Sequence, residues 1–240
     1  DEASVMPKGV PWIQEAAATI DPEAKTVTLQ DGTQVSYDQL VVAVGIAYDW
    51  DKVTGLRDAV GKNGVVSNYL PHLAETTWNE LQAFEGGKMV FTNPSGQIKC
   101  GGAPQKIMYL AEHYTRKRGL RDDTEIIGAF AGTVMLGVPE INATLNDIVE
   151  KRDIHMHFHR DLVAVDADAK TATFAVTGDP DAPHVTMEYD FMHVTPPMRA
   201  PDLIAGSGLE KADGPHAGFV DVDVHTMQHV RHPDVWAIGD

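Results

Sequence analysis

The fold is decided by KMVFT at residues 88–92, PQKIMYLAEHYTRKR at 104–118, EIIGAF at 125–130, PEINATLNDIVEK at 139–151 and IHMHF at 154–158. The three short apolar runs are typical of strands, and the two longer segments between them repeat their apolar residues with helical spacing. Strands that alternate with helices in this way favour a sheet with right-handed crossover connections. The sequence therefore predicts an α/β fold.

The predicted helix over residues 104–118 has matching signals at both ends. Pro104 suits a first helical turn, and three basic residues precede Gly119 at the other end of that helix. A further helix is predicted over residues 70–84, ended by Gly86 and Gly87.

The flanking segments predict more strands. Asp31-Gly32 lies in a hairpin turn, and the apolar run 40–44 is typical of a strand buried on both faces in a parallel sheet. Residues 162–195 are expected to form antiparallel strands that end before Pro196. After a loop over 198–216, short strands are expected at 219–224 and 235–238.

The charge composition limits the kinds of partner that this chain is expected to bind. The 240 residues include 19 Lys and Arg against 35 Asp and Glu, a formal net charge of −16, which argues against nucleic acid and anionic lipid surfaces. No apolar run approaches the roughly 20 residues of a spanning helix, and the N-terminus has no signal-peptide pattern, so this stretch is expected to be soluble. Because the chain starts at Asp1 and its last strand runs straight into Gly239, we expect a piece of a longer protein.

Cys100 is the one cysteine, which excludes an intrachain disulfide and a Cys-rich metal site within this sequence. It lies between a strand and a helix, directly after Lys99 and before Gly101 and Gly102. Free N–H groups at a helix start and a neighbouring cation favour a thiolate, and glycines allow close approach to the sulfur. The alternative is a packed, inert cysteine.

Phosphate-binding loops and metal sites find less support. The strand at 88–92 is followed by NPSG rather than a G-x-G-x-x-G turn, and Val138 stands where a P-loop spaced from Gly132 requires Lys. A nicotinamide or ATP site is therefore not expected in this α/β region. His155, His157 and His159 share a strand face that could bind zinc or copper, but a solvated face is the preferred interpretation, and no metal ligand is assigned.

Three segments together resemble the sulfide:quinone oxidoreductases, in the branch that includes the mitochondrial enzyme. They are IKCGGAPQKIMYL at 98–110, HVTPPM at 193–198 and QHVRHPDVWAIGD at 228–240, and the likeness extends back to VVAVG at 41–45. The resemblance implies a flavoprotein in which FAD takes electrons from sulfide and passes them to a quinone. It also implies a peripheral membrane location for the intact parent protein.

The same resemblance assigns roles to single residues. Cys100 matches the cysteine beside the flavin that, with a second cysteine, forms the bridge which sulfide attacks to give a persulfide. Lys106 matches a lysine that would hold negative charge there. Gly45 matches the glycine where a strand passes the FAD, and Gly239 and Asp240 match the turn whose acid reaches the cofactor.

The resemblance implies a second dinucleotide-binding-like, Rossmann-type domain over residues 51–200, with partial FAD-domain segments at 1–50 and 201–240. The N-terminal FAD fingerprint, the second cysteine and the quinone-binding region of the family are not in this sequence. We therefore expect that this piece alone neither holds FAD tightly nor turns over sulfide. The sulfur acceptor is not specified by the sequence.

Three alternatives stay open from the sequence. A type II NADH:quinone dehydrogenase has similar domains but needs a glycine fingerprint after residues 88–92, which is absent. A non-catalytic binding module is the second, self-associating as a homo-oligomer through sheet surface that a missing domain would cover. A histidine-rich metal binder is the third.

Overall fold

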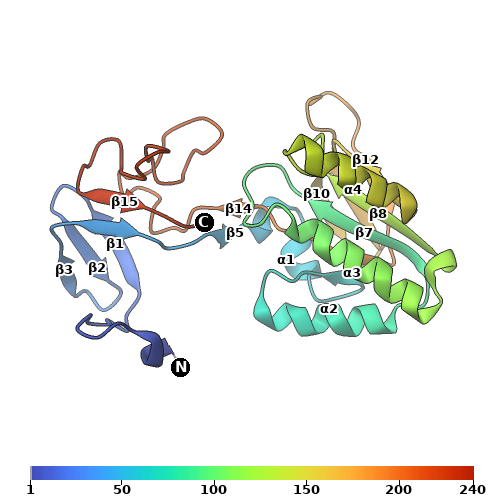
Figure 1. Ribbon diagram of the computed structural model, residues 1–240, viewed down its shortest axis with the longest axis horizontal. Helices are drawn as coiled ribbons and strands as arrows, with labels where there is room; N and C mark the ends of the chain where they lie inside the picture. The colour runs from blue at the N-terminus through green and yellow to red at the C-terminus, as the bar shows by residue number, and fades with distance from the viewer. Residues whose placement is uncertain (1) are drawn as a thin grey trace. The chain divides into compact units, whose positions relative to one another are not determined.

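The computed structural model describes residues 2–240, which fall into two compact units (Figure 1). Unit 1 combines the residues up to Ala47 with Arg199–Asp240, and unit 2 is Tyr48–Met198. The chain passes between them in β5 (Ala47–Tyr48) and β14 (Met198–Arg199), which pair with each other. Within the described residues, no helix has the length and apolar character needed to cross a membrane.

Unit 2 is built on a parallel sheet of five strands in the order β6-β13-β7-β8-β9. Its strands are β6 (Val65–Val66), β7 (Gly87–Asn93), β8 (Thr124–Phe130), β9 (Ile154–His157) and β13 (Phe191–His193). Its helices are α1 (Leu56–Ala59), α2 (Pro71–Ala83), α3 (Ala103–Arg118) and α4 (Pro139–Lys151), with short 3-10 turns at Trp50–Lys52 and Arg121–Asp123. The predicted strands at 88–92, 125–130 and 154–158 and all three predicted helices are confirmed.

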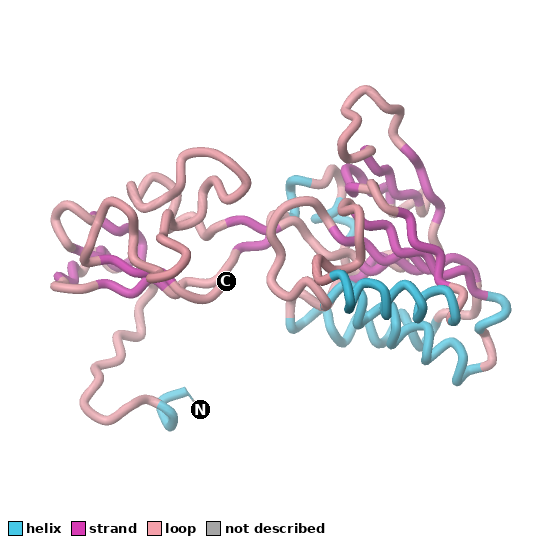
Figure 2. The backbone as a smooth tube through the Cα atoms, turned by 45° about the horizontal axis from the view of Figure 1, so that its top comes forward, coloured by secondary structure: helices cyan, strands magenta, loops and turns pink. Residues whose placement is uncertain are grey.

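The parallel sheet separates two cores, which is why its strands are apolar on both faces. On one face, Met89 and Phe91 of β7 pack with residues of α2, α3 and α4. On the other, Val90 packs with Leu162 and Phe174 of the antiparallel sheet β10 (Asp161–Asp166), β11 (Thr171–Ala175) and β12 (Val185–Glu188). Figure 2 shows the three long helices α2, α3 and α4 gathered along one side of the sheet. Unit 2 therefore has three layers.

The expectation that residues 162–195 form only antiparallel strands is wrong at its last strand. β13 pairs in parallel with β6 and with β7 and lies inside the five-stranded sheet. All three of its residues are buried, so the run suits a position covered on both faces rather than the edge of a hairpin.

Unit 1 holds an antiparallel sheet of β1 (Ala17–Asp21), β2 (Thr26–Leu29) and β3 (Gln34–Ser36), with the predicted Asp-Gly hairpin between β2 and β3. A short 3-10 turn covers Glu2–Val5. β4 (Leu40–Val42) pairs in parallel with β15 (Val235–Ala237), and Val42, Val235 and Ile20 share a small core.

Two expectations for unit 1 are wrong. Val41 of β4 is 58% exposed, because the described residues cover only one face of this strand. Residues 219–224 do not form a strand and make only the isolated bridges Glu210–Val220 and Val222–His229, because the short loops around them give no continuous partner.

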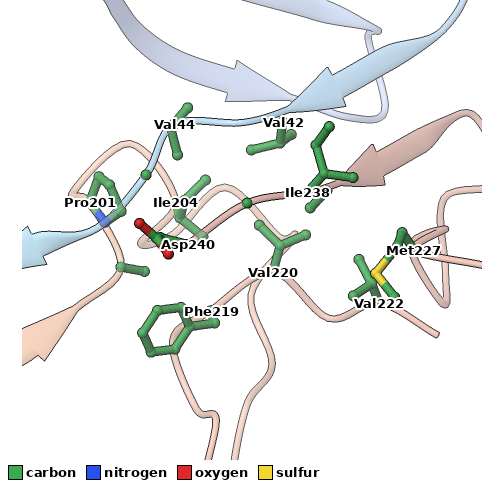
Figure 3. A pocket seen from close by; sticks show the side chains of 14 residues that line it. Val42, Val44, Pro201, Ile204, Phe219, Val220, Val222, Met227, Ile238 and Asp240 are labelled. Carbon is green, nitrogen blue, oxygen red and sulfur yellow. The ribbon is translucent and has the colours of Figure 1, made fainter. Parts of the chain in front are cut away.

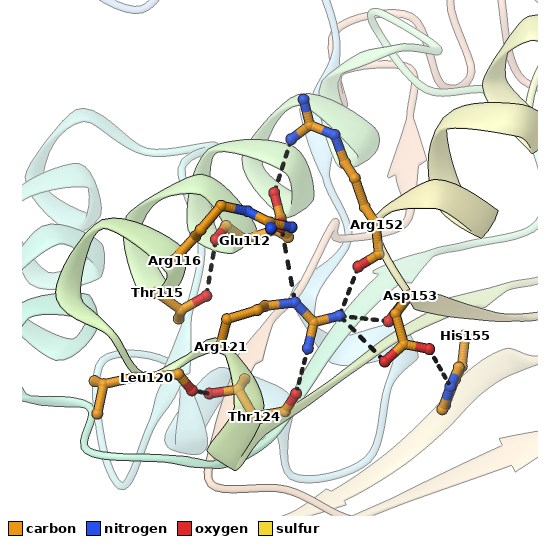
Figure 4. A network of polar contacts seen from close by, with 9 residues as sticks. All are labelled: Glu112, Thr115, Arg116, Leu120, Arg121, Thr124, Arg152, Asp153 and His155. Atoms are coloured by element: carbon orange, nitrogen blue, oxygen red, sulfur yellow. Dashed lines mark hydrogen bonds and ion pairs between the residues drawn. The ribbon is translucent and has the colours of Figure 1, made fainter.

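At the amino end of the parallel sheet, a buried carboxylate anchors α3 to the neighbouring elements (Figure 4). Glu112, with a side chain 0% exposed, pairs with Arg116 and with Arg152, whose Nη1 lies 2.7 Å from Oε2. Arg121 lies 3.7 Å from the same carboxylate and donates to the carbonyl oxygens of Thr124 and Arg152 at 2.7 and 2.6 Å. This cluster ties α3, β8 and the end of α4 together.

Candidate functional site

Cys100 lies in the loop between β7 and α3, at the carboxyl edge of the parallel sheet. Its side chain is exposed, and its φ of +91° puts a non-glycine residue in a region that L-residues rarely adopt. The carbonyl of Cys100 accepts a hydrogen bond from the N–H of Ala103, the first residue of α3, at 2.6 Å. The strained backbone holds the thiol just ahead of a helix start, and such strain is often found at functional sites.

The cation beside the sulfur is Lys106. Its Nζ lies 3.6 Å from the Cys100 Sγ, reached from the first turn of α3. Lys99, which the sequence suggested as the neighbouring cation, instead places its Nζ over the Tyr48 ring, 5.0 Å from the centroid. The backbone N–H of Lys99 donates to the Met198 Sδ. Because the Lys99 ammonium lies over the Tyr48 ring, Lys106 is the cation paired with the sulfur.

Sequence reasoning missed a set of polar side chains at the carboxyl ends of the strands next to β7. Ser67 follows β6 and donates through Oγ to the Val194 carbonyl at 2.8 Å, and the N–H of Thr195 donates to Thr92 Oγ1 at 3.1 Å. Tyr69 lies in the same loop as Ser67, with its ring edge-on to Tyr48 at 5.7 Å. The only signal in the sequence was that these residues directly follow apolar runs. Residues in that position lie together at the carboxyl edge of a parallel sheet.

His193, the last residue of β13, is 1% exposed. Its Nε2 accepts a hydrogen bond from the Asn68 N–H at 3.1 Å, and its Nδ1 has no partner among the described residues. Burial lowers the pKa of His193 to about 3, so the ring is neutral near pH 7. The imidazole therefore joins the loop after β6 to β13 without adding a charge near the thiol.

The predicted glycines of unit 1 meet at a second place. Because β4 and β15 are parallel neighbours, the residues that follow them lie side by side, and Gly45, Gly239 and Asp240 line one hollow (Figure 3). The φ angles of Gly45 and Gly239 are +73° and +93°, and an added Cβ would meet nothing within 4 Å at either residue. Glycine is therefore required by the backbone, and the space beside it is open.

The rest of that hollow is apolar, with Asp240 as its charged member. Its walls include Val44, Ile204, Phe219, Val220, Met227 and Ile238. This hollow suits part of a dinucleotide. Its apolar walls can pack against a ring system, its carboxylate can accept hydrogen bonds from hydroxyls, and the open backbone at the two strand ends leaves room for the chain of the cofactor. The residues present fit one edge of an FAD site.

Three of the histidines contact neighbouring carboxylates or backbone groups. His155 lies 3.4 Å from Glu125 and 3.5 Å from Asp153, whereas the His159 ring contacts the Thr177 carbonyl at 3.0 Å. No group of three or more metal-binding side chains is found in the part of the chain that the structure describes. His229 contacts the Leu209 carbonyl and accepts backbone N–H bonds from Arg231 and His232.

Comparison with known proteins identifies relatives along the whole chain. No protein-family model matches it. It is 40% identical over 99% of its length to the mitochondrial sulfide:quinone oxidoreductase of Mus musculus and 38% identical over 100% to that of Dictyostelium discoideum. The chain spans about half of these relatives, 52% in each case. The sulfide:quinone oxidoreductase structure from Aquifex aeolicus superposes with a TM-score of 0.76 at 22% identity, over 95% of this chain and 51% of that one.

The fold is that of an α/β protein with a Rossmann-like parallel sheet, which the sulfide:quinone oxidoreductase structure from Aquifex aeolicus shares. The chain is similar over its whole length to curated mitochondrial sulfide:quinone oxidoreductases, of which it spans about half.

Proposed function

We propose that the intact parent protein is an FAD-dependent sulfide:quinone oxidoreductase in which Cys100 is a redox cysteine. The observation that carries the proposal is the pairing of the exposed Cys100 thiol with Lys106 at 3.6 Å, in a chain 40% identical to a mitochondrial enzyme of that name. A thiolate held beside a fixed cation is the form of cysteine that exchanges with sulfur compounds.

The sulfur chemistry proceeds by thiol–disulfide exchange. The hydrosulfide ion attacks a disulfide between Cys100 and a second cysteine from the parent protein outside these 240 residues. As the new S–S bond forms, the old one breaks, leaving a persulfide on one cysteine and a thiolate on the other. The Lys106 ammonium offsets the negative charge that collects on sulfur at Cys100, and Gly101 and Gly102 place no side chain beside the incoming sulfur.

FAD supplies the chemistry that a thiol lacks, because it accepts two electrons from sulfur and passes them on to a quinone. We assign one edge of its site to Gly45, Gly239 and Asp240. On this proposal, unit 1 is part of an FAD domain and unit 2 is the second Rossmann-like domain. The parent acts at a membrane surface, where quinones are dissolved, and sulfide and a quinone are its substrates.

The test is an anaerobic visible spectrum of the full-length gene product, with sulfide added to one sample and NADH to another. Sulfide is expected to bleach the flavin band and NADH to leave it unchanged. The Cys100→Ser variant is expected to keep its flavin and lose the response to sulfide. Bleaching by NADH but not by sulfide would reject the proposal and favour a type II NADH:quinone dehydrogenase.

A further inference from the structure

The segment that carries Cys100, residues 94–102, is fixed near its start by an acid from another sheet. Asp161, the first residue of β10, accepts the Ser95 N–H through Oδ1 at 3.1 Å and the Ser95 hydroxyl through Oδ2. One residue of the segment thus contacts both oxygens of the carboxylate. Hydrogen bonds to a carboxylate are stronger than those between neutral groups, so this contact is a firm anchor for the segment.

The anchoring residue is itself held in place by the core. Leu162, which follows Asp161, is 6% exposed and packs with Val90 of β7 on the sheet face opposite α3. Asp161 also pairs with Ala175 in the antiparallel sheet. The cysteine segment is therefore fixed from both sides of the parallel sheet, by Asp161 on one side and by α3 on the other.

The conformation of the segment makes the position of the sulfur depend on this anchor. Gly96 directly follows Ser95 with a φ of +88°, and Cys100 itself has a φ of +91°. A non-glycine residue keeps such a strained backbone only where the surrounding contacts fix it. The next contact along the segment is the Lys99 N–H, which donates to the Met198 Sδ at 3.3 Å. Only three residues separate it from Ser95, so a displacement of Ser95 is passed on to the sulfur.

We propose that Asp161 is a positioning residue for Cys100. Through Ser95, it holds residues 94–102 in the conformation that keeps the sulfur beside Lys106, whose Nζ is 3.6 Å away. Asp161 acts through this segment and not by contact with the sulfur. The inference rests on the proposed function for what the thiol reacts with, whereas the pairing of the thiol with the lysine belongs to the 240-residue chain itself.

The first test depends on the sign of a change in rate. The rate at which iodoacetamide alkylates Cys100 at pH 7 is measured in the 240-residue chain, which has no other cysteine. Asp161→Asn is expected to slow alkylation by about two- to threefold, because the thiolate is paired with Lys106 for less of the time. Removal of a negative charge would by itself favour the thiolate and speed the reaction, so positioning and charge predict opposite changes.

Asp166→Asn is the matched control, from the other end of β10. The Asp166 carboxylate accepts the N–H groups of Asp168 and Ala169 at 3.1 and 2.9 Å, in a turn that does not include the cysteine segment. This variant loses the same charge from the same strand. Its alkylation rate is expected to equal that of the wild type.

A double-mutant cycle separates positioning from a loss of stability. Ser95→Ala is expected to slow alkylation by about twofold, and Ser95→Thr, which retains the hydroxyl, is expected to restore the wild-type rate. In a Lys106→Met background, Ser95→Ala is expected to slow alkylation no further, because its effect runs through the lysine. A purely structural role instead predicts a lower thermal midpoint, with the same ratio of rates in both backgrounds.

Slower alkylation in Asp161→Asn and in Ser95→Ala, with the effect lost when Lys106 is removed, would support the positioning role. Wild-type or faster alkylation in both folded variants would overturn it, and so would an undiminished effect of Ser95→Ala in the Lys106→Met background. Failure of sulfide to bleach the flavin of the full-length protein would reject the proposed function while leaving the alkylation result standing.

Discussion

The sulfur of Cys100 is paired with Lys106, in the first turn of α3. Lys99, which precedes Cys100 in sequence, lies instead over the Tyr48 ring. At the scale of single residues, this difference separates two cations that the sequence alone leaves equivalent. We expect Lys106→Met to slow iodoacetamide alkylation of Cys100 at pH 7 by about three- to tenfold, because the thiolate loses its nearest positive charge. Lys99→Met is the control and is expected to change the rate much less. Equal effects of the two substitutions would show that no specific pairing exists.

His193 sets a second expectation at this scale. Its pKa falls from an ordinary 6.5 to about 3 on folding, so the unfolded chain binds the extra proton throughout the interval between these values. The contribution of the neutral His193 ring to the free energy of unfolding is complete above pH 6.5. As the pH falls below 6.5, the free energy of unfolding decreases by about 1.4 kcal/mol per pH unit. Urea unfolding between pH 7 and 4.5 is expected to show a shallower loss in His193→Gln, which keeps an acceptor for the Asn68 N–H. An identical pH dependence in both proteins would contradict this assignment.

Single residues differ in how far the sequence could reveal their surroundings. Cys100 and Gly239 were identifiable because a strand end, a helix start or a turn is a local pattern. Tyr69 and Thr195 were not, because their meeting depends on the order of strands in the sheet, which no local spacing encodes. The family resemblance pointed to Lys106 beside the thiol, whereas local spacing pointed to Lys99, because the side of α3 that faces Cys100 is set by the fold.

Among the elements, α3 depends on the buried carboxylate of Glu112. We expect Glu112→Gln to destabilise the chain by roughly 3–5 kcal/mol, because it removes the buried counter-charge of the nearly buried Arg121 guanidinium and leaves it only the exposed carboxylate of Asp153. Asp153→Asn is the control, since the Asp153 side chain in its pair with Arg121 is 81% exposed. The unfolding midpoint of this variant is expected to stay close to that of the wild type. Chemical denaturation at neutral pH measures both, and a loss for Glu112→Gln no larger than the control's would mean that the cluster adds little.

The parallel strands and helices of residues 88–158 were predictable because each one repeats its own period. β13 was assigned to the wrong partner because the strands just before it are antiparallel, and its place between β6 and β7 is set by contacts with residues more than a hundred positions earlier. β4 was expected to be covered on both faces, but Val41 and Val44 are 58% and 44% exposed. An apolar run therefore indicates a strand more reliably than it indicates what covers that strand.

At the scale of the whole molecule, we propose that the hollow at Gly45 and Gly239 is only one edge of an FAD site, because the chain covers 52% of the length of its relatives. We expect the purified 240-residue protein to lose FAD on gel filtration and to show no sulfide oxidation. The absorbance at about 450 nm per protein measures retention, with the full-length gene product as the positive control. Flavin at about one equivalent after filtration would contradict the expectation.

Unit 1 is discontinuous, because β4 finds its parallel partner only in β15, beyond the whole of unit 2. During synthesis on a ribosome, all of unit 2 emerges before Val235–Ala237, so the inserted unit can fold first. Until then β4 has an unpaired edge and an apolar surface, which is the condition under which nascent chains attract chaperones or pair with one another. The order of synthesis thus leaves this edge of β4 open from the time the strand emerges until β15 has been made.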